Sequence, residues 1–542
     1  MKKLSGAAGN REGGRFFNFR PALFAAAFFA LGIGFARARL FSGASLLWLL
    51  CGVPVLISAP AFFPENPFRS LAAAAALLLF FVCGGLCFRA EVRAFSSAEQ
   101  ISGECTVVGT VTEKSDYGTV SRVVLSDLII DGKGREGKLV ATLGEEFSEK
   151  AALSRRVVLV GRVETDLSLF GEYGFQSENV EKKIYYSAEA HSLSAAGEDK
   201  DVFLAVRSRL RDRLYRGMDE EPAAVTYALL IGDTSGISAG LLESVRYGGI
   251  AHIFSVSGLN IGSLYVFFRA LTDKTRLRRL PAGLRFAMTG GALVFYAGVC
   301  GFSASVLRAT VMCLVLYASS LFGVKSDMLE NTGIAALLLL AVHPVQLFDL
   351  GFGLSFAACL SIGVLSRTFR DGLDALLPFG GRPEDRPAGI LRKIRGGSIE
   401  FLAVSLAAQA GTLPLLLGSF GYISVWSLAL NCIFVPFVDA VFSLLLALAL
   451  VACLLPASAA PFLLYLPSAV WSAALLLFHA FDFSLVIRGM RMGVAALPFV
   501  GFFLALSDKV NAGRGLRLAL CAIFLAAFAA SLLAASPASG GG

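Results

Sequence analysis

The sequence has 542 residues, of which 56% are hydrophobic and 16% are charged, and its net charge is +8 at pH 7. A set of soluble domains of this length would have about a quarter of its residues charged, so that class is excluded. The apolar residues fall in runs long enough to cross a bilayer as helices, which takes about 20 residues. The composition predicts a polytopic α-helical membrane protein with about ten to twelve spans, some of them broken or re-entrant.

The first apolar run, residues 21–36, follows a basic tail that contains Lys2, Lys3, Arg11, Arg15 and Arg20. This charge pattern predicts a cytoplasmic N-terminus, although two arginines, Arg37 and Arg39, follow the run and oppose the assignment. Two further runs, at 44–63 and 70–88, predict a three-helix anchor. Three spans place the next segment outside the cell membrane.

That next segment, residues 96–201, carries 19 acidic and 12 basic residues, a net charge of −7, so the rest of the chain carries +15. The basic excess of the membrane part indicates either the positive-inside bias of cytoplasmic loops or a path for a polyanion. The insert reads as five short segments rich in Val, Ile, Thr and Tyr: residues 103–114, 121–132, 138–144, 155–164 and 182–190.

This pattern predicts a small extracytoplasmic all-β insert, an antiparallel barrel of the OB type. OB-folds often bind oligonucleotides, but the acidic net charge opposes a general electrostatic grip. Binding of nucleic acid and a structural role as a cap over the membrane part both stay open.

A basic amphipathic helix is predicted at 202–221, because Phe203, Val206, Leu210 and Leu214 share one helical stripe. Its five arginines point more widely around the helix: Arg207, Arg209, Arg211, Arg213 and Arg216. Such helices lie on membrane surfaces with their long side chains reaching the phosphates, and the alternative is a basic entrance for nucleic acid.

From residue 222 the chain is apolar to its end, with basic breaks at 272–285 and 367–396 that indicate cytoplasmic loops. We therefore divide the chain into six segments: an N-terminal cytoplasmic tail at 1–20, the anchor at 21–95, the β insert at 96–201, the basic helix at 202–221, the main membrane domain at 222–510, and a C-terminal transmembrane helix and tail at 511–542.

Polar residues inside predicted spans are costly and mark transport paths. At 100° per residue, His252, Ser255 and Ser263 share one helical face, with Asn260 at its edge. This face predicts either a packed helix interface or a wet cavity. Gly258 and Gly262 form a GxxxG pair, which permits close helix packing.

Further polar residues in apolar runs are Arg308, Asp349, Gln409 and Asn431, with Ser355 nearby. A membrane-embedded arginine finds a partner or water, so Arg308 could contact phosphate or could pair with Asp349. Four scattered histidines and the absence of a nucleophile-elbow sequence predict no metal, no cofactor and no enzymatic activity.

Five strings occur in order: ALLIGDTSGIS, AHIFSVSGLNIG, GFSASVLRATVM, HPVQLFDLGFGLSF, and AAQAGTLP followed by NCIFVP. In order and spacing they closely resemble the competence segment of ComEC-type DNA-uptake channels. The acidic insert resembles, more weakly, the extracytoplasmic OB-like domain of that family. The resemblance covers roughly residues 20 to 500 and assigns 222–510 as a competence-type channel domain.

The resemblance implies an inner-membrane channel that carries single-stranded DNA into the cytoplasm during natural transformation. The positions that match the family motifs are Gly232, Asp233, Ser255, Ser257, Gly258, Asn260, Arg308, Asp349, Gly351, Ser355, Gln409 and Pro414. The predicted substrate path consists of Asp233, His252, Ser255, Ser257, Gly258, Asn260, Arg308, Asp349, Ser355, Gln409 and Asn431. Asn260 stands where the family commonly has His, which weakens any mechanism that needs a titrating group there.

Many family members carry a C-terminal metallo-β-lactamase-like domain, and no HxHxDH string occurs here. The expected partners are therefore single-stranded DNA, the lipid bilayer, and a separate DNA receptor, nuclease and cytoplasmic helicase. Two alternatives stay open: a transporter or flippase for another anionic substrate such as a lipid-linked saccharide, and a membrane enzyme with a polar cluster at the headgroup layer.

Overall fold

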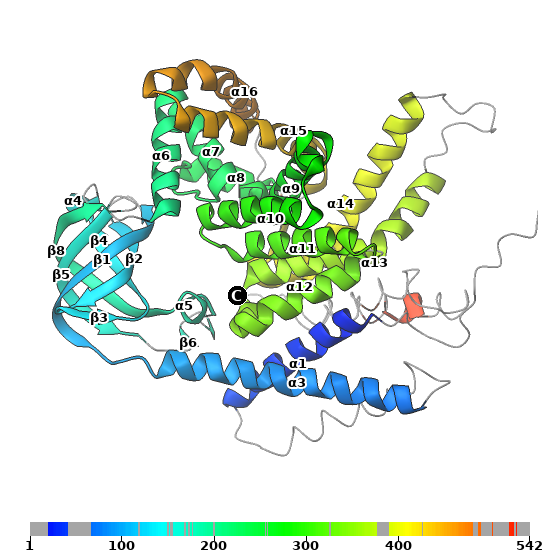
Figure 1. Ribbon diagram of the computed structural model, residues 1–542, viewed down its shortest axis with the longest axis horizontal. Coiled ribbons are helices and arrows are strands. Elements are labelled where there is room, and N and C mark those ends of the chain that lie inside the picture. The colour runs from blue at the N-terminus through cyan, green and yellow to red at the C-terminus, as the bar shows by residue number, and fades with distance from the viewer. Residues whose placement is uncertain are drawn as a thin grey trace, which may run out of the picture.

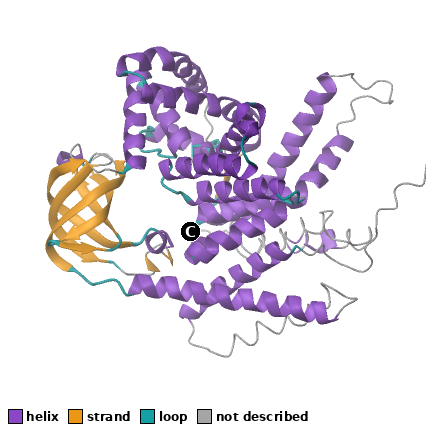
Figure 2. Cartoon of the chain, in the orientation of Figure 1, coloured by secondary structure: helices purple, strands orange, loops and turns teal. Residues whose placement is uncertain are grey.

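The protein consists of a β barrel beside a large body of helices (Figures 1 and 2). The computed structural model describes residues 20–41, 67–116, 120–148, 151, 155–166, 170–171, 174–175, 177–198, 201–254, 256, 258–324, 327–376, 390–424, 426–480, 486–488, 501, 520–524 and 527. The predicted second anchor span and nearly all of the segment 511–542 lie outside the described residues.

Two long helices precede the barrel, α1 (Pro21–Phe41) and α3 (Pro67–Ser96). They approach closely because each presents a glycine to the other's backbone: Gly32 faces the carbonyl of Phe81, and Gly84 faces that of Phe29. A Cβ at either glycine would collide with the opposite helix. This close approach is the small-residue packing that membrane helices use.

The barrel is built from β1 (Ser102–Asp116), β2 (Val120–Ile130), β4 (Lys138–Gly144), β5 (Arg155–Thr165) and β8 (Ile184–Glu198). The five predicted strands are therefore confirmed. The sheet runs β1-β5-β8-β4-β2, and pairing of β2 with β1 closes it. The predicted antiparallel pairing is wrong for one pair, since β4 and β8 pair in parallel, whereas the other neighbours are antiparallel.

Alternation of apolar and polar residues places one side of each strand inside the barrel. Val107, Leu125, Leu139 and Leu159 are fully buried there. Smaller elements decorate the barrel: β3 (Lys133–Arg135), α4 (Glu145–Ser148), β6 (Phe170–Gly171), β7 (Gly174–Phe175) and α5 (Ser177–Glu181).

The helical body begins with α6 (Val202–Gly217), α7 (Glu220–Ile231), α8 (Ala239–Tyr247), α9 (Gly258–Lys274), α10 (Ala282–Val299), α11 (Ala304–Leu321) and α12 (Met328–Val342). It continues with α13 (Leu350–Leu376), α14 (Ile390–Phe420), α15 (Ser427–Leu454) and α16 (Ala460–Ala480). One-turn 3-10 helices η2 (Ala251–Ile253), η3 (Arg276–Arg279), η4 (Pro344–Phe348) and η6 (Ala457–Ala459) join them, and β9 (Tyr422–Ser424) pairs with β10 (Val486–Arg488).

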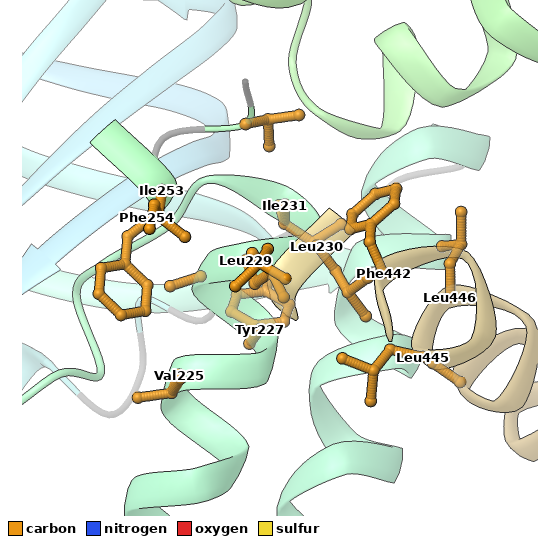
Figure 3. Close-up of a cluster of buried hydrophobic side chains, with 14 of the residues drawn as sticks. Val225, Tyr227, Leu229, Leu230, Ile231, Ile253, Phe254, Phe442, Leu445 and Leu446 are labelled. Atoms are coloured by element: carbon orange, nitrogen blue, oxygen red, sulfur yellow. The ribbon is translucent and has the colours of Figure 1, made fainter. Parts of the chain in front are cut away.

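Helix α7 is the buried centre of this body, since every residue from Pro222 to Ile231 is buried. Figure 3 shows Leu229 and Leu230 between Phe254 on one side and Phe442 on the other. With 12 residues α7 is too short to cross a bilayer, which takes about 20. It is a core helix and positions the loop that follows it.

Five helices in the described part of the chain are long and apolar enough to span a membrane: Pro21–Ala38, Phe68–Ser96, Ala282–Val299, Leu350–Leu376 and Gly396–Phe420. Five shorter apolar helices accompany them. These helices agree with a polytopic membrane protein, whereas the total of ten to twelve spans stays a prediction. Figure 1 shows the barrel at one end of the neighbouring helices α1, α3, α10, α11 and α12.

Candidate functional site

The predicted polar face of one continuous helix at 252–263 is wrong, because the chain breaks there. His252 lies exposed in η2, and α9 begins only at Gly258. Gly249, with φ +73°, turns the chain between α8 and η2. Ser255 and Ser257 lie outside the described residues. His252 and Ser263 therefore belong to different elements and share no helical face.

The loop after α7 is held by a left-handed glycine and by a hydrogen bond from its backbone to Asp233. Gly232 ends α7 in the left-handed conformation, with φ +87°, and Asp233 Oδ1 accepts a hydrogen bond from the N–H of Ser235 at 3.0 Å. A Cβ on Gly232 would lie 3.2 Å from Val256. The loop thus packs against the segment between η2 and α9, and the half-buried Asp233 is held in a turn.

Asn260 has a structural partner. Its Nδ2 donates to the carbonyl of Leu229 at 3.3 Å, and Tyr296 Oη donates to the carbonyl of Leu230 at 2.6 Å. The last carbonyls of a helix lack partners within the helix, and these two side chains supply them for α7. Asn260 is 2% exposed, so it holds the end of α7 from inside the protein.

The two glycines of the GxxxG pair have different surroundings. A Cβ on Gly258 would lie 3.6 Å from the Cβ of Ala309 on α11, whereas one on Gly262 would meet nothing within 4 Å. A side chain at position 258 would therefore make only ordinary van der Waals contact with α11. The pair does not make the close helix crossing that its spacing predicts.

Arg308 is the largest fully buried side chain among the described residues, with 2% of its surface exposed. Arg308 lies near the start of α11. Its guanidinium carbon is 5.6 Å from the ring centre of Phe352 and 5.5 Å from that of Phe356. Both rings come from α13 and contact each other, with centroids 4.3 Å apart. Arg308 is thus held over two aromatic faces, the geometry of a cation–π contact.

The guanidinium of Arg308 keeps unused hydrogen-bonding capacity. Nε and Nη1 are buried and have no hydrogen-bond partner among the residues that the structure describes. Asp349 and Glu181 lie near enough to act on it electrostatically, but no carboxylate among the described residues forms an ion pair with it. Asp349 instead caps α13, its Oδ1 accepting from the N–H of Phe352 at 2.7 Å. The predicted Arg308–Asp349 pair is therefore not formed.

Three further path candidates lie on α13, α14 and α15. Ser355 is half-buried on α13, one residue before Phe356. Gln409 is half-buried on α14, with Nε2 buried and unpartnered. Asn431 is 8% exposed on α15; its Nδ2 donates to Ser427 Oγ at 3.3 Å, and its Oδ1 has no partner. Of these three side chains, Gln409 and Asn431 each keep one buried polar atom without a partner among the described residues.

The apolar stripe of helix α6 packs against other helices. Leu204, Leu210 and Leu214 are buried against other helices, and Phe203 packs on the rings of Phe295 and Phe302. The helix contacts α7, α10, α15 and α16. The apolar stripe is therefore covered by protein.

The five arginines of α6 separate into different environments. Arg207 and Arg211 lie near Tyr227 together with Asp233, and Tyr215 on the same helix abuts Gly236 of the loop. Arg209 and Arg213 lie toward Cys453 on α15, and the exposed Arg216 pairs with Asp212 at 2.9 Å. The structure thus brings Arg207 and Arg211, but not all five, to the loop after α7.

A polar junction between the insert and the helices was not predicted. Glu91 on α3 accepts from the N–H of Val345 at 2.9 Å and contacts His343 Nδ1 at 3.1 Å. Gln346 Nε2 donates to Glu181 Oε1 on α5 at 2.7 Å. The signal was present in the sequence, because His343 and Gln346 belong to the HPVQLFDLGFGLSF string, but their partners lie more than 150 positions away.

This junction reaches Arg308 through one short segment. Residues 343–349 hold His343 and Gln346 at one end and the Asp349 cap of α13 at the other, and α13 carries both rings beneath Arg308. Tyr185 of β8 packs edge-on against Phe95 of α3, with centroids 5.4 Å apart. The described residues contain no group of three His, Cys, Asp or Glu side chains that could hold a metal ion.

Fold and site together define a polytopic helical membrane protein with a β-barrel insert and a buried, unpaired arginine at the start of a central helix. The sequence profile of the family described as competence protein matches residues 229–507, just over half of the chain. The chain therefore belongs to the competence protein family, which confirms the resemblance of its motifs.

The chain is also similar to ComE operon protein 3 of Bacillus subtilis (strain 168), with 25% identity over 270 residues. The match covers 49% of this chain and 32% of that relative, so the chain matches about a third of the relative's length. No solved structure matches the chain.

Proposed function

We propose that this protein is a channel in the inner membrane that carries single-stranded DNA into the cytoplasm during natural transformation. The observation that carries the proposal is Arg308, which lies in the region matched by the competence family and keeps two N–H groups free over Phe352 and Phe356. Arginine pairs with phosphate through a planar fork, and aromatic rings stack on bases. Charge and aromatic faces thus occur together, as a single strand requires.

The insert supports the same proposal as a domain of the OB type. Five strands closed into a barrel, with β4 and β8 parallel and the rest antiparallel, match the five-stranded OB architecture. Through Glu181 and Gln346 the barrel contacts the segment that leads to α13. We infer that an incoming strand passes from the insert toward Arg308, with Arg207, Arg211 and Asp233 beside the route.

The arrangement of the helices supports an external insert and a cytoplasmic N-terminus. Arg20 at the start of α1 pairs with Asp327 at the start of α12 at 2.6 Å, whereas Arg37 near the end of α1 stacks on Phe348 in η4, 4.2 Å from the ring centre. η4 also contacts the insert. The two ends of α1 therefore lie at opposite faces, with the N-terminus at the face away from the barrel.

The same contacts support a three-span anchor. Both α1 and α3 run toward η4, since the later part of each contacts it through Arg37 and Glu91. Two helices that run in the same direction need a return crossing, and residues 42–66 are long enough to supply one. Arg37 after the first apolar run, which opposes this topology by charge alone, has a specific partner in Phe348.

We propose that other proteins supply the receptor for external DNA, the nuclease that removes the second strand, and the helicase that draws the strand inward. The experiment that tests the proposal is uptake of labelled DNA in the native host. Deletion of the gene should abolish internalisation, and Arg308→Gln, which removes the charge while keeping a polar side chain, should lower it at least tenfold at normal protein levels. Arg308→Lys should retain part of the activity, because it keeps the charge but loses the planar fork.

Glu104→Gln serves as the control, since this exposed carboxylate belongs to β1 of the barrel and pairs with an equally exposed His191. Normal uptake in the Arg308→Gln strain would contradict the assignment of Arg308. Normal uptake in the deletion strain, together with an altered envelope, would favour a flippase for another anionic substrate instead.

A further inference from the structure

The loop between α9 and α10 forms a shallow basic depression of about 890 Å³. Its lining residues are Asp273, Lys274, Thr275, Arg276, Arg278 and Arg279. Lys274 and the three arginines are exposed, and within the part of the chain that the structure describes none of them forms an ion pair. Four cations therefore line this depression, and no carboxylate among the described residues forms an ion pair with them.

The one acidic residue of the depression is already neutralised. Asp273 Oδ2 contacts Arg269 Nε at 2.7 Å, and its Oδ1 contacts Arg285 Nη1 at 2.6 Å. These two contacts tie the end of α9 to the start of α10. The turn between the helices is held by Thr275, whose hydroxyl donates to the carbonyl of Leu271 at 2.6 Å and accepts from the N–H of Leu277 at 3.2 Å. The cations are thus presented from a fixed loop.

An exposed apolar surface leads to the depression along both helices. On α9, Phe267 and Leu271 are 49% and 39% exposed and stand on the same helical stripe as Lys274. On α10, a candidate membrane span, Leu284 and Met288 are 47% and 42% exposed. Cations therefore stand at the end of an apolar surface, at the start of a span.

We propose that the depression formed by Lys274, Arg276, Arg278 and Arg279 binds the phosphate headgroup of an anionic phospholipid, whose acyl chains lie along Phe267, Leu271, Leu284 and Met288. Cations next to a span attract anionic headgroups, and the apolar stripes complement acyl chains. A nucleic acid would contact the cations but leave those apolar side chains uncovered. A phospholipid contacts both the basic depression and the apolar side chains. The site is independent of the proposed path through Arg308, and loss of DNA uptake would not bear on it.

Native mass spectrometry of the full chain in detergent, with phosphatidylglycerol or phosphatidylcholine added, tests the proposal. The variant combines Arg276→Gln, Arg278→Gln and Arg279→Gln. Each charge removed should weaken phosphatidylglycerol binding about fivefold, and the three together on the order of 100-fold. Binding of phosphatidylcholine should stay unchanged.

The matched control removes three exposed charges from the barrel, with Arg122→Gln, Lys133→Gln and Arg155→Gln, and should bind phosphatidylglycerol as the natural protein does. Because the variant could lose its fold, the natural protein is also measured at rising salt, where phosphatidylglycerol binding should fall. Unchanged phosphatidylglycerol affinity in the variant would overturn the proposal. So would equal affinity for the two lipids, or salt-independent binding, in the natural protein. A variant that keeps the lipid but loses binding of a 20-mer oligo-dT would assign the depression to nucleic acid instead.

Discussion

At the residue scale, the site separates into side chains that hold helix ends and side chains that keep hydrogen-bonding capacity, of which Arg308 is the most buried. Asn260 and Asp349 both act on helix ends: Asn260 binds the last turn of α7, and Asp349 caps the first turn of α13. Arg308 differs from both, because two of its nitrogens are buried without partners. Leaving buried polar groups unpaired costs free energy, which supports the proposal that Arg308 meets a ligand.

Asn260→Ala should destabilise the protein by about 1 to 3 kcal/mol, because it leaves the carbonyl of Leu229 buried and unpaired. Tyr296→Phe should act in the same direction through Leu230. Gly262→Ala on the same helix is the matched control and should be neutral or slightly stabilising, since its Cβ would meet nothing within 4 Å. Thermal unfolding of the purified variants in detergent checks this, and equal stability of Asn260→Ala and the natural protein would contradict the capping role.

At the element scale, the strands of the insert could be predicted and the polar helix of the site could not. Alternation of Val and Ile with polar residues reports directly on a half-buried strand, and all five segments form strands. The same periodicity argument failed at 252–263, because it assumes an unbroken helix, whereas η2 ends at Ile253 and α9 begins only at Gly258. Contacts between distant segments, such as Glu91 with His343, leave no periodic signal.

Gly32→Ala should weaken the packing of α1 on α3, because the added methyl group would collide with the backbone of Phe81 and force the helices apart. Gly34→Ala, two residues along the same helix, would meet nothing within 4 Å and should be neutral or stabilising by about 1 kcal/mol, as Ala is the better helix former. The amount of folded protein in membranes and its unfolding temperature measure the difference. Equal behaviour of the two variants would contradict the glycine contact between α1 and α3.

The junction at His343 should make stability depend on pH. The hydrogen bond with Glu91 raises the pKa of His343 above its ordinary value of 6.5, while burial opposes this, Glu181 adds to it and Lys183 reduces it. A raised pKa in the folded state stabilises the fold fully below about pH 6.5, and this contribution is lost as pH rises through the higher, folded-state pKa.

The unfolding temperature of the natural protein should therefore fall from pH 6 toward pH 9, and His343→Ala should flatten that part of the profile. His191→Ala is the control, since His191 and its partner Glu104 are both 60% exposed and such pairs contribute little. A His343→Ala profile with the same slope as that of the natural protein would refute this role of the junction.

At the scale of the whole molecule, the barrel, η4 and α13 form one connected series of contacts from the insert to Arg308, which we propose as the route of the strand. Glu181 and Gln346 join the barrel to η4, Asp349 joins η4 to α13, and Phe352 and Phe356 lie beneath the guanidinium. Composition and motif order predicted the membrane class, the β insert and the family. They could not predict this route, which depends on three segments that lie far apart in the sequence.

The most direct test of the central claim is cross-linking of DNA during uptake. A photo-reactive amino acid replaces Phe356 beneath Arg308 or, as the control, Phe295, an exposed side chain of α10. In cells that internalise labelled DNA, irradiation should cross-link the single strand to position 356 and not to position 295. Efficient uptake without a cross-link at 356, or with equal cross-linking at both positions, would contradict a path past Arg308.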